Sequence, residues 1–135
     1  MKKNNIIEIT YVNKNFSAHV PALPGCISTG DTPEVIEKNI KEAIEFHLKG
    51  MQEDGEAIPA SFRNKYSLVY KFNAQSLLKY YKNVITGTAL ERLTGINQKQ
   101  LNHYANNHRK PKETQVLKIK MAFHKLGSEL MSIEM

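Results

Sequence analysis

Hydrophobic and polar residues alternate along the first part of the chain, with the spacing of two that is typical of β-strands. Residues 6–12 (IIEITYV) are rich in β-branched and aromatic side chains, and residues 16–20 (FSAHV) alternate in the same way. The polar residues 13–15 between them suit a tight turn, because asparagine tolerates the positive φ that short hairpins need. The pattern predicts two strands joined as a hairpin.

Two more strands and one helix complete the first part. A short third strand is predicted at residues 26–30, after a proline-containing break. Apolar residues then recur every three or four positions over residues 33–53, which predicts an amphipathic helix that Asp31 or Thr32 caps. Residues 66–72 (YSLVYKF) supply a fourth strand. This order predicts a small α+β layer with the helix packed on one face of the sheet.

From residue 73 the apolar spacing changes to that of short helices. Thr86 is placed to cap one of them, and Thr94 with Gly95 closes it, since glycine suits the left-handed position that follows a helix. Asn97 then caps the next helix. The predicted helices cover residues 74–82, 87–94, 98–105 and 113–126, the last ending at Gly127.

The inner faces of these helices follow from the same spacing. Leu90 and Leu93 are expected to face inward from one helix, and Leu101 and Tyr104 from the next. In the last helix the expected core residues are Val116, Leu117, Met121 and Phe123 or His124. Leu130 and Ile133 form an apolar tail that closes either the core or a dimer contact.

Size and composition indicate a folded, cytoplasmic protein. With 135 residues, 41% of them apolar, the chain has room for one domain or two small ones. No run of about 18 apolar residues occurs, so no membrane segment is expected. The single cysteine, Cys26, has no partner for an intrachain disulfide, which fits a reducing compartment.

The net charge of +6 is unevenly distributed along the chain. Residues 1–70 carry eight Lys/Arg and nine Asp/Glu, whereas residues 71–135 carry eleven and four. Between residues 31 and 56 there are eight acids and three lysines. The acids either face a basic protein or form the solvated side of an amphipathic helix, with Glu–Lys pairs four residues apart; the second interpretation is favoured for most of them.

The helix at residues 98–105 has a polar outer side that suits a DNA groove. Asparagine and glutamine match the adenine edge in the major groove, and the amides at the helix start can take a phosphate oxygen. The basic loop behind the helix adds salt-dependent affinity. The alternative is a helical bundle with a merely charged surface. The candidate DNA-binding residues are Asn97, Gln98, Lys99, Asn102, His103, Asn106, Arg109 and Lys110.

Catalytic and metal chemistry are not expected. His19, Cys26 and His47 are isolated titratable residues of the kind that are most often structural. The sequence contains no glycine-rich phosphate loop and no HExxH or CxxC pairing. We therefore expect no catalytic residue, no metal ligand and no cofactor.

The whole chain resembles a HicB-type antitoxin. The string FSAHVPALPGCISTGDTPEVIEKNIKEAIEFHLKGM, from Phe16 to Met51, carries the resemblance in the first half. In the second half, residues 94–111 resemble the helix–turn–helix variant of the family, which is related to phage repressors. Three positions depart from the usual patterns: Ala22 replaces an acid that often precedes the LPG string, and Gly87 and Glu91 replace a glutamine and a small residue.

The resemblance implies a fold and a function for each half. Residues 1–72 would form a HicB-like domain, a truncated ribonuclease-H-like sheet, that binds and neutralises a HicA-type ribonuclease toxin. Residues 73–135 would form a helix–turn–helix domain that dimerises and represses the operon on double-stranded operator DNA, as a homodimer or tetramer. Two other hypotheses remain: a stand-alone transcriptional regulator with a ligand-sensing N-terminal domain, and a metal-dependent nuclease.

Overall fold

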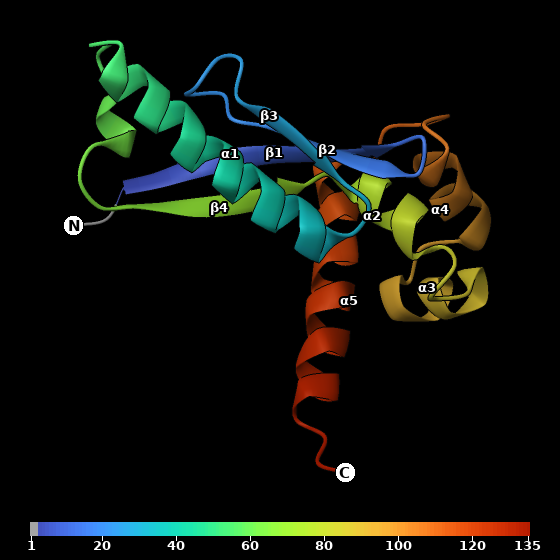
Figure 1. Ribbon diagram of the computed structural model, residues 1–135. Helices are drawn as coiled ribbons and strands as arrows, with labels where there is room; N and C mark the ends of the chain where they lie inside the picture. Colours follow the sequence, from blue (N-terminus) through green and yellow to red (C-terminus); the bar gives the residue numbers. More distant parts are fainter. Residues whose placement is uncertain (1–2) are drawn as a thin grey trace. The chain divides into compact units, whose positions relative to one another are not determined.

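The computed structural model describes residues 3–135, which divide into two compact units between Asn73 and Ala74 (Figure 1). The first unit contains β1 (Lys3–Val12), β2 (Asn15–His19), β3 (Ile27–Gly30), α1 (Pro33–Glu53), the 3-10 helix η1 (Ala60–Phe62) and β4 (Tyr66–Phe72). The second contains α2 (Ala74–Tyr81), α3 (Gly87–Thr94), α4 (Gln98–Ala105) and α5 (Glu113–Met131). This arrangement confirms the predicted α+β class.

The sheet of the first unit has the strand order β3-β2-β1-β4. β1 and β2 form an antiparallel hairpin that closes with Val12 opposite Asn15. The two residues of its turn, Asn13 and Lys14, have φ angles of 55° and 60°, the positive values that a type I′ turn requires. β4 pairs in parallel with β1, so the chain must cross over between them, and α1 lies in that crossover.

α1 covers one face of the sheet (Figure 1). Ile36, Ile40 and Ile44 are fully buried on its inner side, and burial of each such side chain stabilises the unit by about 1.5–3 kcal/mol. The helix begins after Thr32, whose Oγ1 accepts a hydrogen bond from the Val35 amide at 3.1 Å. Of the two predicted caps, Thr32 is therefore the one used. Along α1, within the described part of the chain, the predicted Glu–Lys ion pairs do not form.

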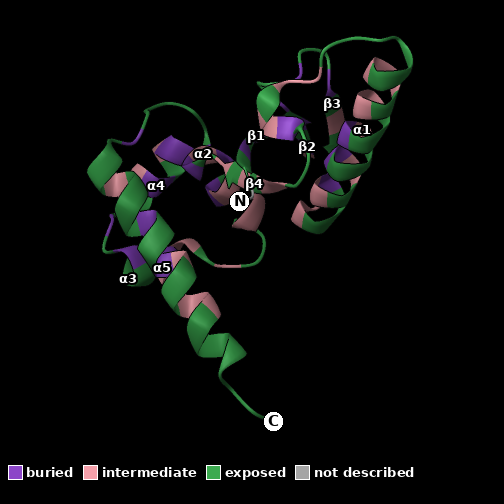
Figure 2. Ribbon diagram, turned by 90° about the vertical axis from the view of Figure 1, so that its left-hand side faces the viewer, coloured by how far each residue is buried: buried purple, intermediate pink, exposed green. Residues whose placement is uncertain are grey.

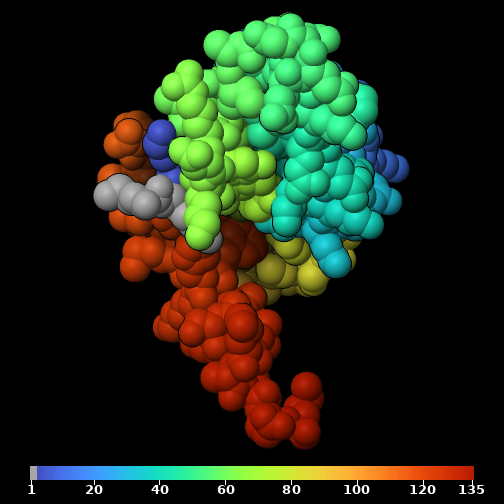
Figure 3. Space-filling model, turned by 60° about the vertical axis from the view of Figure 1, so that its left-hand side comes forward, coloured from blue at the N-terminus to red at the C-terminus, as the bar shows by residue number. Residues whose placement is uncertain are grey.

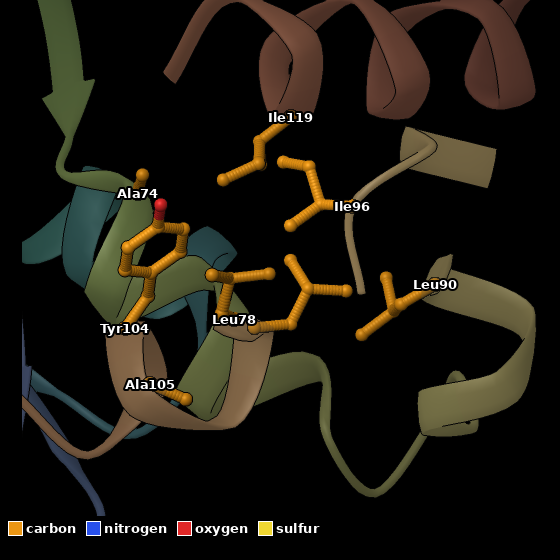
Figure 4. Close-up of a cluster of buried hydrophobic side chains, with 8 residues drawn as sticks. Ala74, Leu78, Leu90, Ile96, Tyr104, Ala105 and Ile119 are labelled. Carbon is orange, nitrogen blue, oxygen red and sulfur yellow. The ribbon is translucent and has the colours of Figure 1, made fainter. Parts of the chain in front are cut away.

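The second unit is built around one apolar cluster to which all four helices and the turn before α4 contribute (Figure 4). Leu78 lies at its centre with only 2% of its surface exposed, and Ile96 and Ile119 close it from the turn and from α5. Burial of these side chains is favourable because it removes apolar surface from water. The cluster consists of Ala74, Leu78, Leu90, Ile96, Leu101, Tyr104, Ala105 and Ile119.

The predicted buried faces of α3 and α5 are partly wrong. Leu93 is 40% exposed, and the buried residue is Thr94, whose hydroxyl donates to the Leu90 carbonyl at 2.7 Å and accepts from the Ile96 amide at 3.1 Å. In α5 the buried residues are Ile119 and Ala122, and Phe123 is only partly buried. The small core has no room for the others, so Val116, Leu117, Met121 and His124 lie exposed.

α5 also runs past its predicted end. It continues through Gly127 to Met131, and Ser132 is its C-cap. A glycine inside a helix costs about 1 kcal/mol relative to alanine, which is too little to end a helix when glutamate, leucine and methionine follow. Leu130 and Ile133 of the apolar tail are 59% and 55% exposed, so they do not close the core of the second unit.

Candidate nucleic-acid interface

α3 and α4 are joined by a tight turn of three residues. Thr86 caps α3 by accepting a hydrogen bond from the Ala89 amide at 3.1 Å. Gly95 follows the helix with φ 73°, and its amide donates to the Glu91 carbonyl at 2.8 Å. Ile96 is buried directly after it. This geometry fixes the direction in which α4 leaves the turn, because the glycine conformation and the buried isoleucine leave little freedom.

The first amides of α4 are already hydrogen-bonded within the protein. The Asn97 side chain accepts from the Lys99 amide at 2.8 Å. The Glu91 carboxylate accepts from the Gln98 amide at 2.7 Å, where it also balances the positive end of the helix dipole. The prediction that these amides take a phosphate oxygen is therefore wrong for Gln98 and Lys99. A phosphate at this point would also meet the negative charge of Glu91.

The outer side of α4 carries the polar side chains predicted for it. Gln98, Lys99 and Asn102 are exposed, and His103 is half-buried, whereas Leu101 and Tyr104 on the inner side are only 3% and 2% exposed. Two further side chains are more constrained. Asn97 acts as the cap described above, and the Oδ1 atom of Asn106 accepts a hydrogen bond from Lys79 of α2 at 3.1 Å.

The Gln98 side chain folds over Gly87 at the start of α3. A Cβ atom placed on Gly87 would collide with Nε2 of Gln98. Beside this pair lies a hollow of about 200 Å³ whose polar lining includes Gln98, Asn102 and Lys82. Because Gly87 has no side chain, it leaves the space in which the Gln98 amide group lies.

The loop after α4 presents positive charge next to the helix. Asn107 adopts a left-handed φ of 59°, and the amides of His108 and Arg109 donate to the His103 carbonyl at 2.8 and 3.3 Å. Arg109 and Lys110 are exposed. Together with Lys112 they line a second, open hollow of about 520 Å³ beside Gln100 and Tyr104. Such a cationic rim suits a polyanion.

Three residues of this surface were missed by the sequence analysis as contributors. Glu91 is seven residues away from Gln98 and reaches its amide only through the turn geometry. Lys79 lies on α2 and Lys82 directly follows it, and both approach α4 only through packing of the helical core. A positive charge on α2 is visible in the sequence, but its proximity to α4 is not.

The titratable residues of the first unit form no comparable site. His19 and Glu8 lie next to each other on the exposed surface of the sheet, with 3.1 Å between Nε2 and Oε2. Cys26 is buried, and that burial raises the pKa of its thiol. Across residues 3–135, no three His, Cys, Asp or Glu side chains come together as metal ligands would. Over the same residues, no helix is long and apolar enough to cross a bilayer.

Comparisons with known proteins identify the first unit. Residues 5–75, more than half of the chain, match the family of HicB-like antitoxins of bacterial toxin–antitoxin systems. The first unit therefore belongs to a class of bacterial antitoxins. The chain is a member of the HicB-like antitoxin family, as the resemblance implied.

Two relatives extend this comparison. An uncharacterised 14.9 kDa protein of Haemophilus phage HP1 is 49% identical over 53 residues, which are 39% of this chain and 40% of the phage protein. A UPF0150 protein of Thermoplasma acidophilum is 41% identical over 44 residues, 33% of this chain and 64% of that protein. The matched parts cover less than two thirds of either relative.

Proposed function

We propose that this protein is an antitoxin with two activities: its first unit binds and neutralises a HicA-type ribonuclease toxin, and its second unit represses the toxin–antitoxin operon by binding operator DNA. The family of the first unit supports the antitoxin role. Membership of an antitoxin family implies in general that the protein has a toxin as its partner. The identity of the toxin, the operator and the oligomeric state are parts of the proposal.

One observation carries the DNA-binding half of the proposal: α4 is held by a tight turn with its amide-bearing side exposed. Two short helices joined in this way form the helix–turn–helix, whose second helix enters the major groove. Gln98 and Asn102 would contact base edges, preferentially adenine. Lys99, Arg109 and Lys110 would contact phosphates, and the half-buried His103 would lie at the edge of the contact.

The two kinds of contact make different contributions to binding. Phosphate contacts supply affinity that falls steeply with salt but does not depend on sequence. Base contacts supply the preference for the operator, each good bidentate pair contributing about 1–3 kcal/mol of discrimination. A two-fold symmetric assembly would read a palindrome with half-sites about one helical turn apart.

The double substitution Gln98→Ala with Asn102→Ala tests this assignment. Operator affinity is expected to fall at least about 30-fold in a gel-shift titration at fixed salt, while binding to unrelated DNA stays unchanged. Gln52→Ala, which removes an exposed amide of the first unit, is the control. Unchanged operator affinity in the double variant would show that α4 does not read the operator.

The antitoxin half predicts that the reading frame beside this gene encodes a small basic protein, and that protein is used to test it. Co-expression and purification should yield a stable complex without ribonuclease activity, and the Gln98→Ala/Asn102→Ala variant should form it equally well. A ligand-sensing regulator would instead bind a small molecule in its first unit and form no such complex. Failure of the wild-type chain to bind the neighbouring protein would reject the antitoxin proposal.

A further inference from the structure

The most exposed aromatic side chain of the first unit is Phe46, on the outer side of α1. Its surface is 80% exposed, although a phenylalanine removes a large apolar area from water when it packs. Its helix is otherwise conventional, with Ile36, Ile40 and Ile44 fully buried against the sheet. Figure 2 shows the same division, with the buried side of α1 toward the strands and the exposed side away from them.

Phe46 belongs to a stripe that runs the length of the helix at spacings of three and four residues. Val35, at the start of the stripe, is 37% exposed. Asn39 comes next, and its Nδ2 donates to the Thr29 carbonyl of the edge strand β3 at 2.8 Å. The start of the stripe therefore adjoins β3, whereas Phe46, two turns further along the helix, is exposed. In Figure 3 the outer surface of α1 faces the viewer with no segment of the first unit covering it.

Phe46 lies in a net acidic segment of the chain, in which Glu42 is four residues before it and Lys49 three residues after it. Residues 42–56 contain five acids and one lysine. In the described part of the chain, none of these five carboxylates forms an ion pair. Burial, and then the charge of Glu45, raise the pKa of Tyr66 on the neighbouring strand. An exposed apolar side chain on a helix of net negative charge favours a cationic partner with an apolar pocket.

We infer that Phe46 is the anchor of a docking surface on α1, and that its occupant is a basic protein which inserts the ring into an apolar pocket. This inference rests on the proposed function, in which the toxin is that basic partner. Large aromatic residues at the centre of an interface commonly carry most of the binding energy. Surrounding charges such as Glu42 and Glu45 mainly accelerate encounter. The acidic surroundings disfavour an anionic lipid surface as the occupant.

The test measures affinity and rates between the full-length chain and a nuclease-inactive variant of the neighbouring toxin. Phe46→Ala is expected to weaken binding at least about 30-fold, mainly through faster dissociation. Glu42→Gln with Glu45→Gln is expected to slow association and to reduce its dependence on salt. Ile27→Thr is the matched control, because Ile27 is 67% exposed on the sheet face opposite α1, and it should change affinity less than about threefold.

The outcomes separate this inference from the proposed function. If the wild-type chain binds the toxin and Phe46→Ala binds equally well, the anchor is wrong and the antitoxin role stands. If the wild-type chain does not bind, the antitoxin role itself fails. If Phe46→Ala instead changes the oligomeric state and leaves toxin affinity unchanged, the surface contacts a second copy of the chain and the inference is overturned. Circular dichroism establishes that each variant is folded.

Discussion

Gly87 leaves the space that the Gln98 side chain occupies. A substitution at this position is therefore expected to change operator affinity without lowering the stability of the fold. Alanine at position 87 would displace the end of a flexible side chain, which costs little free energy of folding. We expect Gly87→Ala to leave the thermal midpoint unchanged or raised, since alanine favours helices. Operator affinity should fall about tenfold, because the displaced amide loses its aligned contact.

Gly127→Ala is the matched control for that substitution. A Cβ atom on Gly127 meets nothing within 4 Å, and the residue lies inside α5. This variant should gain about 0.5–1 kcal/mol of stability and retain wild-type operator affinity. If Gly87→Ala also binds the operator normally, the position of the Gln98 amide does not determine recognition.

Glu37 is expected to make folding depend on pH. Burial, and then the nearby charge of Glu34, raise the pKa of Glu37 above its ordinary value. The native state therefore holds this proton more tightly than the unfolded chain does. Its favourable contribution is complete below the unfolded pKa and is lost as pH rises through the folded pKa. Glu37→Gln should raise the urea midpoint at pH 7 but not at pH 3, and an equal difference at both pH values would contradict this.

The position of each helix and strand depends on local backbone chemistry and on tertiary packing. The turn before α4 is an example in which local chemistry dominates. Gly95→Ala would place a Cβ on a residue with φ 73°. Nothing lies within 4 Å of that Cβ, so the penalty is purely conformational. We expect the second unit to lose about 1 kcal/mol of stability in urea unfolding. A variant as stable as the wild type would show that the turn relaxes to another geometry.

The strands and helices themselves were largely predictable because strong local signals mark them. The hairpin turn, Thr32 and Gly95 each require a particular backbone conformation or hydrogen bond. The predictions were wrong where tertiary packing, and not a local backbone conformation or hydrogen bond, decides which side chains are buried or in contact. α5 offers more apolar residues than the core can bury, so spacing alone could not select Ile119 over Leu117. Similarly, Glu91 reaches Gln98 only because the turn folds one helix back beside the other.

At the scale of the whole molecule, the proposed repressor must assemble symmetrically, and α5 offers a surface for this. Leu117 and Met121 lie four residues apart on one side of the helix and are 54% and 61% exposed, and Met131 at its end is 89% exposed. A second copy that covers them would bury apolar surface and place two copies of α4 on one operator. We propose this pairing as the contact of the two-fold assembly in the function proposed above.

Leu117→Gln with Met121→Gln tests the pairing without changing charge or removing good helix formers. The variant should sediment as a monomer and bind a palindromic operator at least about tenfold more weakly, with binding to a single half-site unchanged. Circular dichroism should remain that of the wild type. A variant that keeps the assembly of the wild type would place the contact elsewhere.

The parallel pairing of β1 with β4 affects how the protein is made. β1 is a central strand, but its parallel partner, starting at Tyr66, is synthesised some sixty residues later. Until then a nascent chain exposes the amide and carbonyl groups along one side of β1, and such an open edge readily pairs with other chains. Ribosomes that stall before this point would release a product prone to aggregate, so a functional first unit exists only once translation has passed β4.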